Sequence, residues 1–257
     1  MSTKAPIYTR ENCLFAYQLH WELVISWRFK VSDSRWYENL RKRILSTGIQ
    51  ISNHRFLQPG TSRFLVSTRP NLAPLALVDD VQELLQDIVR VELPHALHNT
   101  FRLRSLGILS RATLEELVDS NVPHEKTGHE QPLTQVSQPI DLSRPQTCKR
   151  GSYSYNLQVV MESEPSVIPE PKSFQKMAYD KVLHISQANN IALSCAAIQP
   201  DHFDLVLGCP IELAPADVAL KFMNALAESS FRKPIFRFSV FISTFGEKEW
   251  DEQLPID

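Results

Sequence analysis

The sequence predicts an α+β protein made of two β-α-β-β-α-β units, and two observations carry this prediction. The first is a repeat, because the segment 58–74, QPGTSRFLVSTRPNLAP, aligns without a gap with the segment 199–215, QPDHFDLVLGCPIELAP. Gln58, Pro59, Leu72, Ala73 and Pro74 are identical to the residues 141 positions later. The second is that the hydrophobic patterns around both segments follow one order. A structural unit that occurs twice in 257 residues indicates a duplicated domain.

The elements of the first copy follow from alternation and from turn residues. Apolar and aromatic side chains at the odd positions of 14–29 are typical of a strand with one buried face. In chain order we expect a strand over 14–29, a helix from Ser32 or Ser34 to about Leu45, strands over 49–57 and 63–69 around a turn at 58–61, a helix after Pro74 and a strand over 101–106.

The second copy repeats this order. We expect a strand over 153–161, a helix carrying Phe174 to Ile185, strands over 191–198 and 203–208, a helix carrying Val218 to Leu226 and a strand over 235–245. This order of elements is the ferredoxin-like one. Because the segment between the copies is polar and lacks periodicity, we expect a first repeat over 1–121, a linker over 122–150 and a second repeat over 151–257.

Composition excludes several classes of function. The net charge of −2 argues against a nucleic-acid binder driven by overall charge, although it leaves room for a local basic face. The seven glycines form no Gly-rich phosphate loop, and the four cysteines lack Cys-x-x-Cys spacing. The sequence has neither a signal-peptide pattern nor an apolar run long enough to cross a bilayer. We therefore expect a cytoplasmic protein without a membrane partner.

Two short strings resemble a known family. Pro200-Asp201-His202-Phe203-Asp204 stands at the start of a predicted strand, and ATLEELVDSN, at 112–121, follows the strand predicted over 101–106. Both resemble the single-tyrosine transposases of the HUH superfamily, of the insertion-sequence-200 type. The resemblance implies a strand with two metal-binding histidines and a later helix with a nucleophilic tyrosine. Asp204 then stands at the second histidine position, and Leu117 at the tyrosine position.

The resemblance also implies that this chemistry has been lost. Family members cleave single-stranded DNA through a covalent phosphotyrosine, with a divalent metal on the scissile phosphate. Leu117 has no nucleophilic atom, and Thr61 and Arg63 replace both histidines in the first copy. We therefore expect no catalytic residue at these positions. The family's homodimeric arrangement further implies that the two repeats form an intramolecular pseudo-dimer with joined antiparallel sheets in a monomeric chain.

The second copy leaves a metal site open as an alternative. His202 and Asp204 alternate along a predicted strand and so share one face. Together with Asn121 they are candidate ligands for Mg²⁺ or Mn²⁺. The competing interpretation is a surface histidine beside an aspartate, with no cofactor.

Basic and aromatic residues suggest nucleic acid as a partner. The candidate phosphate-binding residues are Arg41, Lys42, Arg43, Arg102 and Arg104. Trp21, Trp27 and Trp36 are candidates either for stacking on bases or for the core. Our hypothesis is a catalytically inactive, domesticated transposase-like protein that binds single-stranded or hairpin DNA as an accessory or regulatory factor. The alternatives are a protein-interaction scaffold without nucleic acid and a residual metal-dependent nuclease or transposase.

Overall fold

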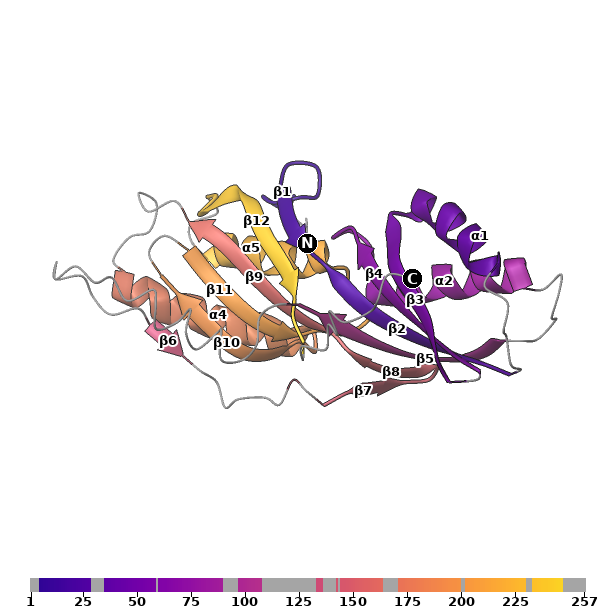
Figure 1. Cartoon of the computed structure of the whole chain (residues 1–257). Helices are drawn as coiled ribbons and strands as arrows, with labels where there is room; N and C mark the ends of the chain where they lie inside the picture. The colour runs from indigo at the N-terminus through magenta and orange to yellow at the C-terminus, as the bar shows by residue number, and fades with distance from the viewer. Residues whose placement is uncertain are drawn as a thin grey trace, which may run out of the picture.

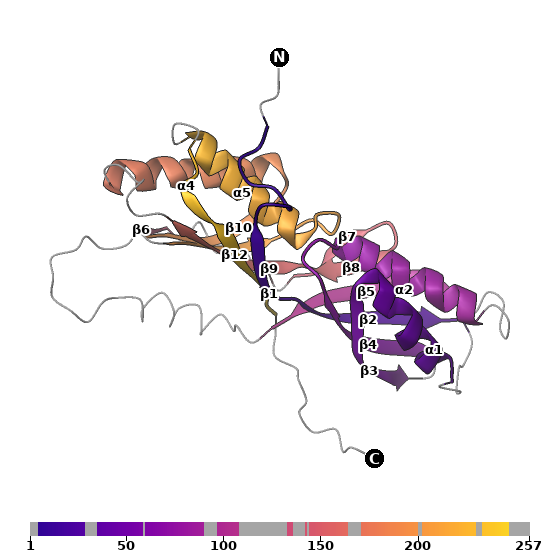
Figure 2. The ribbon, with the colours of Figure 1, turned by 90° about the horizontal axis from the view of Figure 1, so that it is seen from above.

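Two six-stranded sheets and four α-helices make up the described part of the chain, a mixed α+β arrangement (Figure 1). The computed structural model describes residues 5–28, 35–58, 60–89, 97–107, 133–135, 142, 144–163, 171–199, 202–229 and 233–246. Each sheet carries two helices on one face, and no helix in the described part of the chain covers its other face, which we call the open face (Figure 2). None of the helices described combines the length and apolar character needed to cross a membrane.

The two halves share one strand order. In the first half the elements are β2 His20–Trp27, α1 Arg35–Ile44, the 3₁₀ turn η1 Leu45–Thr47, β3 Ile49–Gln58, β4 Thr61–Thr68, α2 Pro74–Val89 and β5 Leu97–Leu106. In the second half they are β9 Asn156–Ser163, α4 Pro171–Ala188, β10 Ala192–Ile198, β11 His202–Gly208, α5 Pro215–Ser229 and β12 Phe236–Thr244. The sheets contain β3-β4-β2-β5 and β10-β11-β9-β12, with all these neighbours antiparallel.

Each half contributes one strand to the edge of the other half's sheet. β1, Leu14–Gln18, runs parallel to β12, whereas β8, Gly151–Ser154, runs parallel to β5. The prediction of one strand over 14–29 and one over 153–161 is therefore wrong, because each segment divides between two sheets (Figure 1). The breaks fall at Leu19 and Tyr155, which are both buried. The Leu19 carbonyl accepts a hydrogen bond from the N–H of Thr68, the last residue of β4, and the Tyr155 carbonyl accepts one from the N–H of Cys209, which follows β11.

Two short strands lie inside the range 122–150 that the sequence predicts as a linker. β6, Leu133–Gln135, pairs with β10, and β7, Gln146–Cys148, pairs with β8. Nothing in their local sequence alternates strongly enough to indicate a strand, so their pairing depends on the sheet edge that they meet. The segment 112–121 lies outside the described residues.

The helix-facing side of each sheet forms the core. The three tryptophans considered for base stacking, Trp21, Trp27 and Trp36, are all buried there, so their role is packing. The Trp21 and Tyr155 rings meet edge to face with centroids 5.3 Å apart, which joins the cores of the two halves. Because side chains alternate along each strand, residues between these apolar positions lie on the open face.

A pair of hydroxyl side chains bridges the two halves. Thr244 Oγ1, at the end of β12, accepts a hydrogen bond from the His20 N–H at 2.9 Å. The same oxygen lies 2.6 Å from the Leu106 carbonyl, to which it donates. One hydroxyl of the second half therefore satisfies two backbone groups of the first half.

A hydroxyl of the first half, that of Ser105, bonds to two backbone groups of the second half in the same way. Ser105 Oγ accepts from the Asn156 N–H at 3.1 Å and donates to the Phe245 carbonyl at 2.8 Å. The first turns of α2 and α5 also bond to the other half. The Leu75 N–H of α2 donates to the Ile211 carbonyl, and the Ala216 N–H of α5 donates to the Pro70 carbonyl. These four side-chain contacts and two helix contacts correspond to one another when the halves are interchanged, as in an isologous two-fold interface. We call these contacts the seam.

Candidate nucleic-acid interface

A row of arginines crosses the open face of the first sheet. The strand register places Arg55 of β3 opposite Arg63 of β4, and Val24 of β2 between Arg63 and Arg102 of β5. Arg104 follows two residues after Arg102 and therefore lies on the same face. Neighbouring strands are about 4.8 Å apart, so four guanidinium groups gather on one sheet face. We call Arg55, Arg63, Arg102 and Arg104 the arginine face.

Glu22 is the sole acidic residue in strands β2 to β5, and it holds two of these arginines. Its side chain is 3% exposed and forms ion pairs with Arg63 Nε and with Arg104 Nε, the latter at 2.7 Å. Arg104 Nη2 also donates to Glu22 Oε2 at 3.3 Å. A carboxylate buried to this degree is stable only because the paired cations compensate its desolvation. The trio is thereby fixed in position and keeps a net charge of about +1.

The other two arginines add charge that no described carboxylate neutralises. Arg102 is exposed, and no ion pair joins it to any residue in the described part of the chain. Arg55 stands directly opposite Arg63, a like-charge arrangement that destabilises a sheet unless an anion or solvent relieves it. Together these positions make the arginine face a locally cationic surface on a protein whose total charge is −2.

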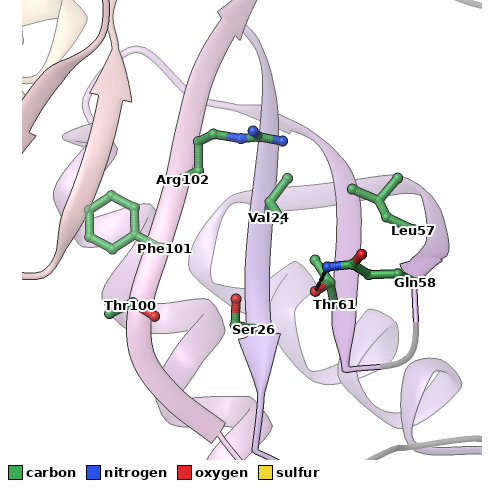
Figure 3. A pocket seen from close by; sticks show the side chains of 8 residues that line it. All are labelled: Val24, Ser26, Leu57, Gln58, Thr61, Thr100, Phe101 and Arg102. Carbon is green, nitrogen blue, oxygen red and sulfur yellow. Dashed lines mark hydrogen bonds between the residues drawn. The ribbon is translucent and has the colours of Figure 1, made fainter.

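Two hollows flank Arg102. One, of about 430 Å³, is lined by Val24, Ser26, Leu57, Gln58, Thr61, Thr100, Phe101 and Arg102. Figure 3 shows the Arg102 side chain reaching over Val24, while Phe101 points to the other side of the strand. Gln58 Nε2 lies 3.4 Å from Thr61 Oγ1 across this hollow.

The second hollow, also of about 430 Å³, lies on the seam side of Arg102. Its lining includes Arg104, Ser105, Tyr153, Ser154 and Asn156. These residues come from β5, β8 and the start of β9, so the hollow exists only where the two halves meet.

The corresponding row of the second sheet has no arginine. Ala197 of β10, Asp204 of β11, Val160 of β9 and Phe241 of β12 lie side by side in the register. Gln158 occupies the place that Glu22 has in the first sheet. This row therefore offers no cation to a phosphate.

Asp204 and His202 lie on the same face of β11. Gln158 Nε2 donates to Asp204 Oδ2 at 2.9 Å, whereas Oδ1 is buried without a hydrogen-bond partner. Burial raises the pKa of the Asp204 carboxyl, and the Gln158 hydrogen bond and the nearby His202 oppose that rise. Within the described ranges no three His, Cys, Asp or Glu side chains gather as metal ligands. Asn121 and Leu117 lie outside the described residues.

The predicted basic residues fall on two different surfaces. Arg41, Lys42 and Arg43 are exposed in the last turn of α1, on the helix side of the sheet, where a cation favours the helix C-terminus. Arg43 pairs with Asp87 of α2 at 3.2 Å. Arg102 and Arg104 lie on the open side, so a single ligand contacting both groups would have to reach around the sheet.

Sequence reasoning missed Arg55 as a member of the arginine face and Glu22 as the carboxylate that pairs with Arg63 and Arg104. Two β-bulges in β3, between Ile51 and Asn53 and between Phe56 and Gln58, change which residues share a face. Simple alternation therefore assigns Arg55 to no particular surface. Glu22 lies among apolar residues of β2, and the even spacing of 20, 22, 24 and 26 was the available signal that it faces away from the core.

Comparisons with known proteins leave the family open. No protein-family model and no curated protein matches the chain. Among solved structures, a candidate transposase from Deinococcus radiodurans is 13% identical, covers 46% of this chain and 97% of its own, and has a TM-score of 0.33.

Other solved structures resemble the chain at a similarly low level. A candidate glycine cleavage system transcriptional repressor is 12% identical over 90% of this chain and 100% of its own, with a TM-score of 0.24. A mutant chlorite dismutase from Candidatus Nitrospira defluvii is 10% identical over 89% of this chain and 92% of its own, also with a TM-score of 0.24. TM-scores this low assign neither a family nor a function.

Proposed function

We propose that this protein binds single-stranded or hairpin DNA on the arginine face of its first sheet, without cutting it. The observation that carries the proposal is the cluster of four guanidinium groups on one sheet face against one buried carboxylate. Guanidinium groups bind phosphate oxygens through paired hydrogen bonds, and they keep their charge at every physiological pH. The two halves are proposed to derive from one duplicated transposase-like unit, and the protein acts as an accessory or regulatory factor.

Loss of catalysis is supported by the residues at the positions that the resemblance assigns to metal binding. Arg63 lies at one of them and is paired with Glu22. A permanently protonated guanidinium has no lone pair for a metal and repels a cation. Leu117, at the tyrosine position, has no atom that attacks a phosphate. Binding without cleavage is the activity that these side chains favour.

A single strand suits this surface better than an unbent duplex. The open face of a sheet offers a broad, gently twisted platform, and the hollows beside Arg102 interrupt it. Unpaired nucleotides can turn their bases into such hollows while phosphates contact the arginines. Because total charge is slightly negative, attraction depends on local phosphate contacts and weakens steeply with salt.

The test is fluorescence anisotropy of labelled single-stranded and hairpin DNA at low and near-physiological salt. We expect Arg102→Ala and Arg55→Ala each to weaken binding about fivefold to tenfold and to reduce the single-strand salt slope by about 0.7. Arg237→Ala is the matched control, because Arg237 carries the same charge but pairs with Glu162 in the second half. Arg41→Ala tests the helix side.

The outcomes separate the proposals. Loss of binding only in the two arginine-face variants supports the proposal. Equal loss in Arg41→Ala or Arg237→Ala contradicts the location. No binding to any DNA at low salt contradicts the function and favours a protein-interaction scaffold.

A second candidate, residual metal-dependent cleavage, is favoured by the unpartnered Oδ1 of Asp204 beside His202. It requires DNA cleavage with Mg²⁺ or Mn²⁺ that disappears in His202→Ala. An intact substrate after prolonged incubation with either metal removes this candidate.

A further inference from the structure

Arg102 occupies a central position between the two hollows. The first lies toward β2 and β4, and the second lies toward β8 and the seam. The Arg102 guanidinium is exposed between them and is paired with no other described side chain. A cation with a recess on either side has the layout of a site for one anionic group that carries two larger substituents.

The first hollow combines an apolar floor with a polar rim. Val24 forms the floor, and Ser26, Thr61 and Thr100 supply hydroxyls that both donate and accept hydrogen bonds. Gln58 adds a carboxamide, which offers one donor and one acceptor edge to a planar partner (Figure 3). Nucleobases have an apolar face and mixed donor and acceptor edges, so this lining matches them.

The second hollow offers similar chemistry from a different source. Ser154 contributes a hydroxyl and Asn156 a carboxamide, and Leu142 and Pro145 also line the hollow. The Tyr153 ring lies on the other side of β8, where it packs in the core opposite Leu103. The Asn156 amide nitrogen already donates to the Leu142 carbonyl at 3.3 Å, which fixes its orientation. Its carbonyl oxygen stays available to accept. Because the strand β8 reaches the first sheet only through the strand exchange, this hollow depends on the tandem arrangement.

We propose that the two hollows receive two consecutive unpaired bases, with Arg102 on the phosphodiester between them. This inference rests on the proposed function and adds to it the substrate class: a single-stranded step whose bases are turned toward the protein. A paired base is held in its duplex and cannot enter a recess on a sheet face, so the site discriminates against fully paired DNA. Base contacts of this kind tolerate different sequences because every base has an apolar face.

The experiment scans one abasic position along an oligonucleotide of fixed length, which keeps the number of phosphates constant. We expect two adjacent abasic positions to weaken binding about tenfold each, the size that one base contact contributes. Ser26→Leu fills the first hollow and Ser154→Leu the second; each is expected to remove sensitivity to one of the two positions. Gln18→Leu is the matched control, since Gln18 on β1 corresponds to Ser154 on β8.

The outcomes distinguish this inference from the function on which it rests. Salt-sensitive binding with no abasic dependence, or with dependence that survives both leucine variants, overturns the inference and leaves DNA binding intact. Absence of binding to every oligonucleotide overturns both. Equal effects of Gln18→Leu and Ser154→Leu also overturn it, because the second hollow would then have no special part. Urea unfolding of each variant checks that the fold is kept.

Discussion

The open faces of the two sheets differ far more than the sheets themselves. Both halves have the same strand order and the same helix-facing core. In the first half the open row reads Arg55, Arg63, Val24 and Arg102, whereas in the second the matching row reads Ala197, Asp204, Val160 and Phe241. Helix-facing positions must fill a close-packed core, but open-face positions are free to take charge. The arginines on which the proposed DNA binding depends therefore lie in the first half.

The seam shows the opposite behaviour. Thr244 and Ser105 each satisfy one N–H and one carbonyl of the other half. Since an unsatisfied buried backbone group is costly, a hydroxyl side chain is needed equally at Thr244 and at Ser105. The molecule is thus symmetric where its halves hold each other and asymmetric where a ligand would bind.

The largest expected effect tests the buried carboxylate of the first half. Glu22→Ala leaves Arg63 and Arg104 partly buried without their anion, so we expect the free energy of unfolding to fall by about 3–5 kcal/mol. Glu162→Ala removes an exposed pair with Arg237 in the second half and should cost less than about 1 kcal/mol. Urea denaturation measures both. Similar losses in the two variants would mean that the trio is no more important than a surface pair.

The next largest expected loss of stability comes from replacing the two glycines at the seam, Gly107 and Gly246. A Cβ at Gly107 would lie 2.0 Å from the Thr244 carbonyl oxygen, and a Cβ at Gly246 would lie 2.2 Å from the Ser105 carbonyl oxygen. We expect Gly107→Ala and Gly246→Ala each to destabilise by about 1–3 kcal/mol, because the neighbouring backbone must move. Thermal unfolding measures the loss, with Ser239→Ala on β12 as the control. An effect from only one of the two glycines would contradict the equivalence of the two sides.

The hydroxyl exchange should give smaller, matched losses. Thr244→Val and Ser105→Ala each leave one N–H and one carbonyl without a partner at the seam, for which we expect about 1–2 kcal/mol apiece. Chemical denaturation of the two single variants and of the double variant measures them. Unequal single losses would show that one half carries more of the seam than the other.

The smallest effect concerns the carboxyl of the second half and depends on pH. Burial raises the folded-state pKa of Asp204 above its unfolded value of about 3.9, so the folded state holds its proton more tightly. Stability is therefore lost as pH rises from about 4 through the folded pKa, and Asp204→Asn removes that loss.

Asp204→Asn should match the unchanged protein below about pH 4 and become relatively more stable as the pH rises toward 7. Urea midpoints taken across this range measure the difference. Glu22→Gln provides the contrast, since removing a carboxylate that has two cationic partners should destabilise at neutral pH. A pH-independent difference for Asp204→Asn would contradict the raised pKa.

Much of the fold could be predicted from local patterns. Alternation along 20–27 and 202–208 indicates which side chains face the helices, and the repeated segment indicates that 61–68 and 202–208 occupy matching places. The strand break at Leu19 could not be predicted, since the apolar alternation continues through it. Of the proposed site, Arg102 and Arg104 were predicted from their shared strand face, whereas Arg63 was noted only as the replacement of a metal-binding histidine. That Glu22 links Arg63 and Arg104 could not be predicted, because it depends on which strands lie side by side.

The sequence by itself determined the β-α-β-β-α-β order within each half, most of the division into buried and open faces, and the presence of two similar halves. Those features depend on side-chain periodicity and turn residues, which act within a few positions of the chain. Only the tertiary structure decided that Leu14–Gln18 joins β12, that Gly151–Ser154 joins β5, and that Arg55 lies beside Arg63. Strand partners come from segments far away in sequence, and a bulge changes the face of a residue without changing its identity.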